Sequence, residues 1–169
     1  MTMSQNLSRY LAQKQASYDT VTHTRSSSAV QSAIASHVPS KTVAKAVVLK
    51  DPVDNYLMAV IPADRRLHLR VLEDIVDAPL KLAEEDELIN KFRDCKTGAI
   101  PAVGPAFNMD MIWDDRFLST TDVYLEAGDH ETLVHVSGET FRDLTSHSPH
   151  DQISRPSKGE EIDTDWDAF

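Results

Sequence analysis

The chain has 169 residues, of which 41% are hydrophobic, and it carries a formal net charge of −10 and a single cysteine. This length suits one domain with a sizeable core, and no apolar run approaches the roughly 18 residues that span a bilayer. These features exclude a membrane-spanning or disulfide-stapled protein, indicate a reducing, cytoplasmic setting, and argue against DNA or non-specific nucleic-acid binding.

The first third of the chain alternates helical and extended patterns. A serine run at residues 26–28 offers N-caps, and the DPVDN sequence between two β-rich runs is typical of a hairpin turn. In chain order, the spacing of apolar residues predicts a helix through Leu7, Tyr10 and Leu11, a strand over 18–22, a helix with the inner stripe Val30, Ala33, Ile34 and His37, and strands over 43–50 and 56–61.

The remainder predicts two further helices, three strands and a closing helix. Their positions are helices through Leu69, Leu72, Ile75 and Val76 and through Leu88, Ile89 and Phe92, strands over 109–113, 123–126 and 132–136, and a helix over 138–144 capped by Ser137. Strands that follow one another without intervening helices predict an α+β fold with a mixed, largely antiparallel sheet flanked by helices. Residues 1–145 would form this domain.

The last segment, residues 146–169, is polar, contains two prolines and carries six acidic and two basic residues. It has no periodic apolar pattern, which predicts an acidic, disordered tail. The closing sequence EEIDTDWDAF also fits an acidic-aromatic docking peptide, and that alternative stays open.

Lys45 is the most informative single residue. In the run VAKAVVLK both faces of the predicted strand are apolar, so the strand should be central and the Lys45 side chain should start inside the fold. A buried ammonium is costly unless it is paired or reaches a wet pocket where a ligand meets it. A lysine that extends past a sheet edge explains the pattern equally well.

Other chemistry-bearing residues give weaker signals. The loop GAIPAVGP, residues 98–105, holds two glycines and two prolines and would be rigid enough to offer backbone groups to a ligand, although a connector explains it as well. The histidines show no metal-ligand spacing, so no metal is expected. His23 follows a predicted strand and precedes the serine caps, which places it at the mouth of a cleft. Cys95 fits a structural thiol better than a nucleophile.

Several segments, in order, resemble the YbaK/EbsC family of prolyl-tRNA editing domains, also called aminoacyl-tRNA deacylase domains. The resemblance covers Tyr18 to Leu144, and it rests on His23 after a strand and on the segments VAKAVVLKD, LMAVIPADRRLHL, KLAEEDEL, GAIPAVG and AGDHETLVHVSGETFRDL. Lys45 occupies the place of the family's pocket lysine.

The resemblance implies a hydrolase that acts in trans and removes a small, wrongly attached amino acid from the acceptor end of tRNA, without metal or organic cofactor, with an aminoacyl-tRNA synthetase as a further partner. Lys45 would be the catalytic residue that positions the terminal adenosine or the ester. The substrate-binding set implied by the family motifs is His23, Gly98, Ala99, Ile100, Pro101, Ala102, Gly104 and Asp129.

The loop departs from the family pattern at one position. Ala102 stands where the family has a proline, so the family's preference for alanine or cysteine is not carried over. The departure and the acidic body leave an alternative in a different class, a non-catalytic ligand- or protein-binding module of the same fold.

Overall fold

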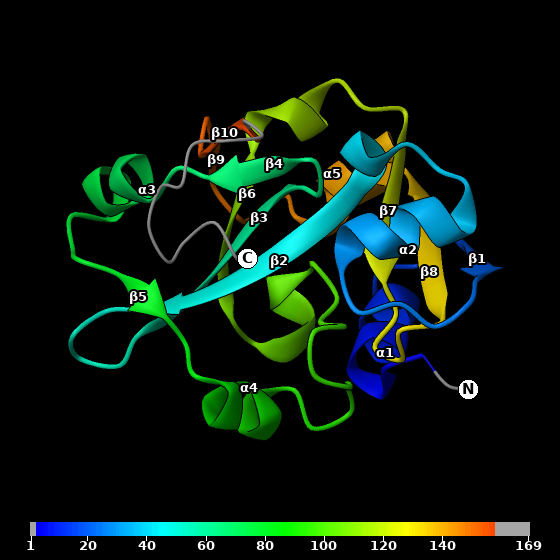
Figure 1. Cartoon of the computed structure of the whole chain (residues 1–169), viewed down its shortest axis with the longest axis horizontal. Helices are drawn as coiled ribbons and strands as arrows, with labels where there is room; N and C mark the ends of the chain where they lie inside the picture. The colour runs from blue at the N-terminus through cyan, green and yellow to red at the C-terminus, as the bar shows by residue number, and fades with distance from the viewer. Residues whose placement is uncertain (1–2, 158–169) are drawn as a thin grey trace.

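The computed structural model describes residues 3–157, which form a sheet with helices packed around it (Figure 1). The sheet has the strand order β1-β8-β7-β2-β3-β6-β9, and β5 also pairs with β2. Its strands are β1 (Asp19–Thr22), β2 (Val43–Lys50), β3 (Tyr56–Pro62), β5 (Lys81–Leu82), β6 (Asp110–Asp114), β7 (Asp122–Glu126), β8 (Thr132–Ser137) and β9 (His150–Asp151). A separate two-stranded sheet joins β4 (Arg65–Leu67) to β10 (Ser154–Pro156).

The pairing within the sheet is mixed. β1–β8, β7–β8, β2–β3 and β2–β5 are antiparallel, whereas β2–β7, β3–β6 and β6–β9 are parallel. The helices are α1 (Gln5–Gln13), α2 (Ala29–Ser36), α3 (Leu69–Val76), α4 (Glu85–Lys91) and α5 (Gly138–Leu144), with short 3-10 turns η1 (Ser40–Thr42), η2 (Gly104–Phe107) and η3 (Asp115–Leu118). The predicted α+β class with a largely antiparallel mixed sheet is confirmed.

β2 is the central strand, as its two apolar faces predict. Ala44 and Val48 pack into the larger core cluster beneath α1, whereas Val47 and Leu49 pack with α3 and β4 on the opposite side. In Figure 1 β2 crosses the whole molecule, with β7 beside its beginning and β5 beside its end. This arrangement places the middle of β2 close to the centre of the fold.

The inner stripe predicted for α2 is partly wrong. Val30 and Ile34 are exposed, and the buried side chains of the helix are the small residues Ala29, Ser32 and Ala33. Small residues let the helix lie close to the sheet, and Ser32 makes a polar contact with β7 that an apolar-period argument does not detect. His37 ends the helix in a left-handed conformation.

The tail predicted from residue 146 is also corrected. Residues 150–156 form β9 and β10, which pair with β6 and β4, and Ile153 is fully buried between α3 and the sheet. The backbone N–H of Ile153 donates to the Asp114 carboxylate. These two strands form only by pairing with strands that are distant in the sequence, so the local sequence does not predict them. The rest of the predicted tail, residues 158–169, lies outside the described residues.

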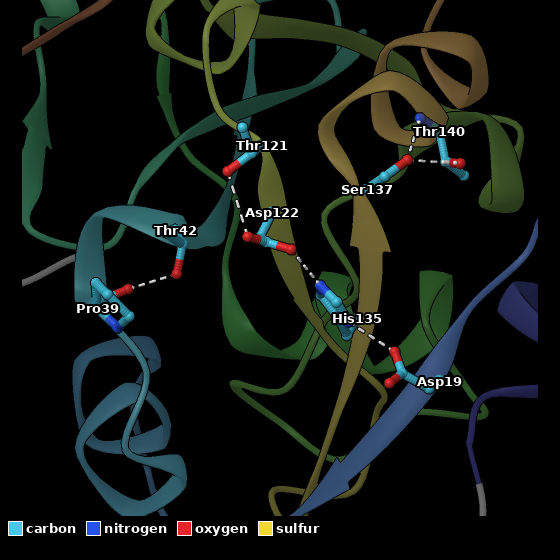
Figure 2. A network of polar contacts seen from close by, with 8 residues as sticks. All are labelled: Asp19, Pro39, Thr42, Thr121, Asp122, His135, Ser137 and Thr140. Atoms are coloured by element: carbon cyan, nitrogen blue, oxygen red, sulfur yellow. Dashed lines mark hydrogen bonds and ion pairs between the residues drawn. The ribbon is translucent and has the colours of Figure 1, made fainter.

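The outer strands are joined by a polar network that centres on His135 (Figure 2). Nδ1 of His135 lies 2.7 Å from Asp19 of β1, and Nε2 lies 2.8 Å from Asp122 of β7. Burial lowers the pKa of His135, but the hydrogen bonds to Asp122 and Asp19 outweigh burial and hold the pKa above its ordinary value. His135 therefore fastens three neighbouring strands on the solvent side and has no contact with the cavity described next.

Candidate functional site

A cavity of about 380 Å³ lies against the middle of β2. We call it the β2 cavity. Its walls come from the start of α2, from β2, from the β5–α4 junction, from the loop before η2 and from the end of β7. The lining residues are Ser27, Ser28, Ala29, Ala44, Lys45, Ala46, Val47, Val48, Leu82, Ala83, Glu85, Leu88, Thr97, Gly98, Ile100 and Glu126.

The β2 cavity exists because the sheet is interrupted beside β2. β7 pairs with β2 only at Val43 and Ala44, and β5 pairs with it only at Leu49 and Lys50. The intervening stretch, residues 45–48, borders the cavity. Five consecutive residues of β2 line it, and since successive side chains point to opposite faces, such a run means that the strand edge itself faces the cavity. The site therefore offers backbone groups as well as side chains.

Lys45 lies at this open edge, at the place where β2 and β7 part. Its Nζ donates to the backbone carbonyl of Arg65, at 3.4 Å, and the residue is half-buried. Burial lowers the pKa of Lys45, the nearby Arg66 guanidinium lowers it further, and Asp64 opposes them. Lys45 therefore starts inside the central strand and borders the β2 cavity.

The glycine-proline loop divides into two parts. Gly98 and Ile100 line the β2 cavity, and Gly98 has a positive φ of 83°, a conformation that favours glycine. The other predicted loop residues are not brought to the cavity, because Ala99, Pro101, Ala102 and Gly104 are buried in the fold. A Cβ on Gly104 would lie 2.6 Å from the Met109 carbonyl oxygen, so close packing explains this glycine.

Ala102, which stands where the family has a proline, does not line the β2 cavity. Ala102 is fully buried and belongs to the larger core cluster, together with Phe92 and Val103. Its side chain therefore acts on the packing beneath the loop, and the cavity wall at this point is formed by Ile100.

His23 and Asp129 also lie outside the cavity lining. Nδ1 of His23 lies 2.6 Å from the Thr24 carbonyl, and its Nε2 is buried without a hydrogen-bond partner in the described structure. The Asp129 carboxylate accepts hydrogen bonds from the backbone N–H groups of Glu131 and Thr132 and from the Thr132 hydroxyl. Asp129 thus shapes the turn between β7 and β8, which directly follows the cavity residue Glu126.

The sequence-based prediction missed most of the cavity lining, above all Glu126, and also His130, which supports the lining from outside. Glu126, the last residue of β7, lines the cavity, is 4% exposed, and accepts a 2.5 Å hydrogen bond from Ser32. Burial raises the pKa of Glu126 to about 7, the Ser32 hydrogen bond opposes this shift, and the charge of Asp129 adds to it. His130 contacts the carbonyl of Thr97 and so holds the loop that carries Gly98.

The α4 wall of the cavity is fixed by a polar contact across the sheet. Glu87 of α4 binds Lys50 at the end of β2 and accepts a 2.7 Å hydrogen bond from the Tyr56 hydroxyl of β3. The Lys50 ammonium hydrogen bond is the main cause of a pKa of about 2 for Glu87. Glu85, two residues before Glu87, and Leu88, the residue after it, are thereby held at the cavity.

Cys95 lies outside the cavity lining. Burial, together with the neighbouring Asp94 carboxylate, raises the pKa of the Cys95 thiol to about 12, so the thiolate needed for nucleophilic attack is disfavoured. Among residues 3–157, no group of three or more His, Cys, Asp and Glu side chains is placed to hold a metal ion. None of the helices in this range is long and apolar enough to cross a membrane.

The chain matches one family profile, that of the aminoacyl-tRNA editing domain, over residues 23–144. No curated protein matches the chain by sequence. The profile match includes Lys45, Gly98 and Glu126, as well as every other residue that lines the β2 cavity.

Three solved structures are similar to the chain in fold. A hypothetical protein has a TM-score of 0.77 and 19% identity, with 89% of this chain and 100% of that chain covered. A candidate trans-editing enzyme for prolyl-tRNA synthetase has a TM-score of 0.75 and 18% identity, over 90% of this chain and 96% of that chain. A candidate signal-transduction protein from Marinobacter aquaeolei VT8 has a TM-score of 0.71 and 17% identity, over 88% of this chain but only 30% of that chain.

Proposed function

The chain belongs to the aminoacyl-tRNA editing domain family, and on this premise we propose that it hydrolyses the ester between a small amino acid and the 3′ end of a wrongly charged tRNA. The observation that carries the proposal is the β2 cavity, a partly open and largely apolar space with Lys45 at its strand-edge wall. Lys45 is the residue that we assign to catalysis. The enzyme would act in trans, on tRNA released by a synthetase.

Hydrolysis of an aminoacyl ester requires few catalytic groups. An aminoacyl ester is already activated, so that holding a water molecule in line and stabilising the developing oxyanion suffice for hydrolysis. The Lys45 ammonium supplies positive charge to the ester oxygen, and the backbone around Gly98 and the open edge of β2 supply polar groups close by. This scheme uses no metal or organic cofactor.

The size of the cavity supports a small amino acid. Its side walls are Ala44, Ala46, Leu82, Leu88 and Ile100, and the whole space of about 380 Å³ must hold the aminoacyl group together with part of the terminal sugar. A binding pocket gains only about 1–3 kcal/mol per methylene, but steric exclusion of a larger side chain can be stronger than that. We therefore propose that large aminoacyl groups are excluded sterically by these walls, and the total volume does not by itself set the limit.

The experiment is a deacylation panel with purified protein. We expect tRNAs charged with glycine, alanine, serine or cysteine to be hydrolysed faster than the spontaneous rate, and tRNAs charged with leucine or phenylalanine to remain intact. Release of the labelled amino acid is the measurement, with the same tRNA in buffer as the control. Equal rates for alanyl and phenylalanyl esters would contradict selection by cavity size.

A second hollow supports an RNA substrate despite the net charge of −10. We call it the basic hollow. It has a volume of about 400 Å³ and is lined by Lys41, Thr42, Pro62, Asp64, Arg65, Arg116, Ser119, Thr120 and Thr121. Three cations face one carboxylate there, and burial together with the Arg116 charge lowers the pKa of Arg65, so an anion is favoured beside the two guanidinium groups. The Lys45 ammonium binds the backbone of Arg65, which places the hollow next to the cavity.

Arg116 tests this assignment. Arg116→Ala is expected to raise KM for aminoacyl-tRNA about tenfold and to reduce the slope of log affinity against log salt by about one, because one phosphate contact is lost. Hydrolysis of a short aminoacyl-adenosine ester should be unchanged. Arg9→Ala, an exposed substitution on α1, is the matched control. An equal loss on the short ester would contradict a phosphate-binding role.

The alternative function is a binding module without catalysis. The observation that favours it is the fold match with the candidate signal-transduction protein. The matched region is only 30% of that protein, so there the fold is one part of a larger chain. Under this reading a non-hydrolysable aminoacyl-adenosine amide would bind, whereas none of the esters in the panel would be cleaved above background.

A further inference from the structure

Glu126 is an acidic residue in a buried position, where the desolvation of a carboxylate costs free energy. It is 4% exposed, its Oε1 accepts the Ser32 hydroxyl at 2.5 Å, and its Oε2 is buried with no hydrogen-bond partner in the described structure. A buried polar atom without a partner costs free energy and calls for an explanation. Since Glu126 also lines the β2 cavity, the missing partner can be a ligand.

The sheet register places Glu126 beside the catalytic lysine. β2 and β7 run parallel and pair Val43 with Tyr124 and Ala44 with Leu125. The next residues on the two strands are Lys45 and Glu126, at the point where the strands separate and the cavity opens. A substrate that enters the gap therefore meets a cation on one strand and a carboxyl group on the other.

The hydrogen bond from Ser32 does not by itself explain why residue 126 is a glutamate. Ser26, Ser32 and Glu126 form a short hydrogen-bonded chain that ties α2 to β7, with 2.7 Å between the two serine hydroxyls. A neutral side chain would make the same tie without a buried ionisable group. The remaining walls are mostly apolar, and the other carboxylate of the lining, Glu85 of α4, is exposed to solvent, so Glu126 is the acid best placed to recognise a cation inside the space.

We propose that Glu126 receives the α-ammonium group of the aminoacyl ester, so that the β2 cavity selects esters with a free α-amino group. This inference rests on the proposed function and deepens it. The Glu126 carboxyl ionises as the ammonium arrives, because an opposite charge in contact favours the charged form of an acid. The pKa of Glu126, which burial raises, agrees with this sequence of events. Lys45, on the neighbouring strand, is left to act on the ester.

The experiment compares alanyl-tRNA with N-acetyl-alanyl-tRNA, which has the same ester but no ammonium group. The wild-type protein is expected to hydrolyse alanyl-tRNA about 10- to 100-fold faster, the range of a hydrogen bond to a charged group. Glu126→Gln should lose this preference by slowing only the alanyl substrate. Ser32→Ala, which removes the partner of Oε1 but keeps the carboxyl group, should retain the preference and is the matched control.

A second readout separates this inference from the proposed function. The alanyl amide of 3′-amino-3′-deoxyadenosine cannot be hydrolysed through an ester, and its binding is measured by calorimetry beside its N-acetyl form. We expect Glu126→Gln to reduce the affinity ratio of the two compounds to near one. This result would uphold the ammonium site even if no ester is cleaved.

Three results would overturn the inference. Equal affinity and equal rate of the wild type for the free and acetylated forms would show that no ammonium is recognised. An equal slowing of both esters by Glu126→Gln would fit a general base or a purely structural group. Failure of the wild type to bind either adenosine compound would also overturn it, because an ammonium site in this cavity requires binding of the free amine.

Discussion

Lys45→Met is expected to lower the rate of ester hydrolysis about 100- to 1000-fold, the effect of removing one group that stabilises an oxyanion. Methionine keeps the unbranched apolar stem of lysine and removes only its charge, so the packing of β2 should persist. Single-turnover release of alanine from alanyl-tRNA measures the loss. The thermal unfolding midpoint of the variant should remain close to that of the wild type, since the wild-type ammonium is half-buried.

Two further variants delimit the role of Lys45. Lys45→Arg keeps the positive charge in a planar group of different reach, and we expect only partial recovery of the rate. Lys14→Ala removes an exposed lysine at the end of α1 that does not line the cavity, and it should leave the rate unchanged. A Lys45→Met protein that remains folded and fully active would remove Lys45 from catalysis.

Glu126→Gln is expected to change how stability depends on pH. The pKa of Glu126 is about 7 in the folded protein and 4.5 for the ordinary group. Between these pH values the folded state holds more protons than the unfolded state, so the free energy of unfolding falls as pH rises through this window, by about 3 kcal/mol in total for this group. The variant lacks this loss, because glutamine does not titrate.

The measurement is chemical unfolding of both proteins at pH 5 and pH 8. The two stabilities should be similar at pH 5, and the variant should be more stable by up to about 3 kcal/mol at pH 8. Ser32→Ala provides the opposite case: it removes the hydrogen bond that holds the Glu126 pKa down, so its stability should fall more steeply with pH. A constant difference between wild type and Glu126→Gln across pH would contradict a raised pKa.

The central strands and their site lysine could be predicted because their patterns are local. Residues 43–50 alternate between two apolar faces, and this period identified β2 as central and Lys45 as unusual. The closing helix was predicted with its bounds, since Ser137 gives a clear cap and accepts a hydrogen bond from the backbone of Thr140. Such signals need no knowledge of distant partners.

The cavity itself could not be predicted, because it forms where no strand pairs with the middle of β2 on that edge. Nothing in the run from residue 45 to 48 indicates that β7 and β5 stop short of it. β5, β9 and β10 have only two or three residues and form by contact with other strands. Likewise, Ala99 and Ala102 look like loop residues in the sequence, yet the fold buries them.

Glu126 could not have been found by the argument that singled out Lys45. In β7 the side chains of Val123 and Leu125 point to one face and are fully buried, whereas Glu126 shares the other face with the exposed Asp122, where an acid is unremarkable. What the strand pattern lacks is the neighbour: only the parallel pairing of β2 with β7 brings the two charged residues to the same opening. The sequence therefore indicated Lys45 alone, and the strand pairing adds Glu126 to the site.

The most direct test of the central claim is the single-turnover fate of alanyl-tRNA with the protein in excess. Hydrolysis at the β2 cavity predicts first-order release of alanine well above the rate in buffer with the wild type, and release at the buffer rate with Lys45→Met. Release at the buffer rate with both proteins, while the non-hydrolysable adenosine amide still binds, would contradict an editing hydrolase and leave the binding module.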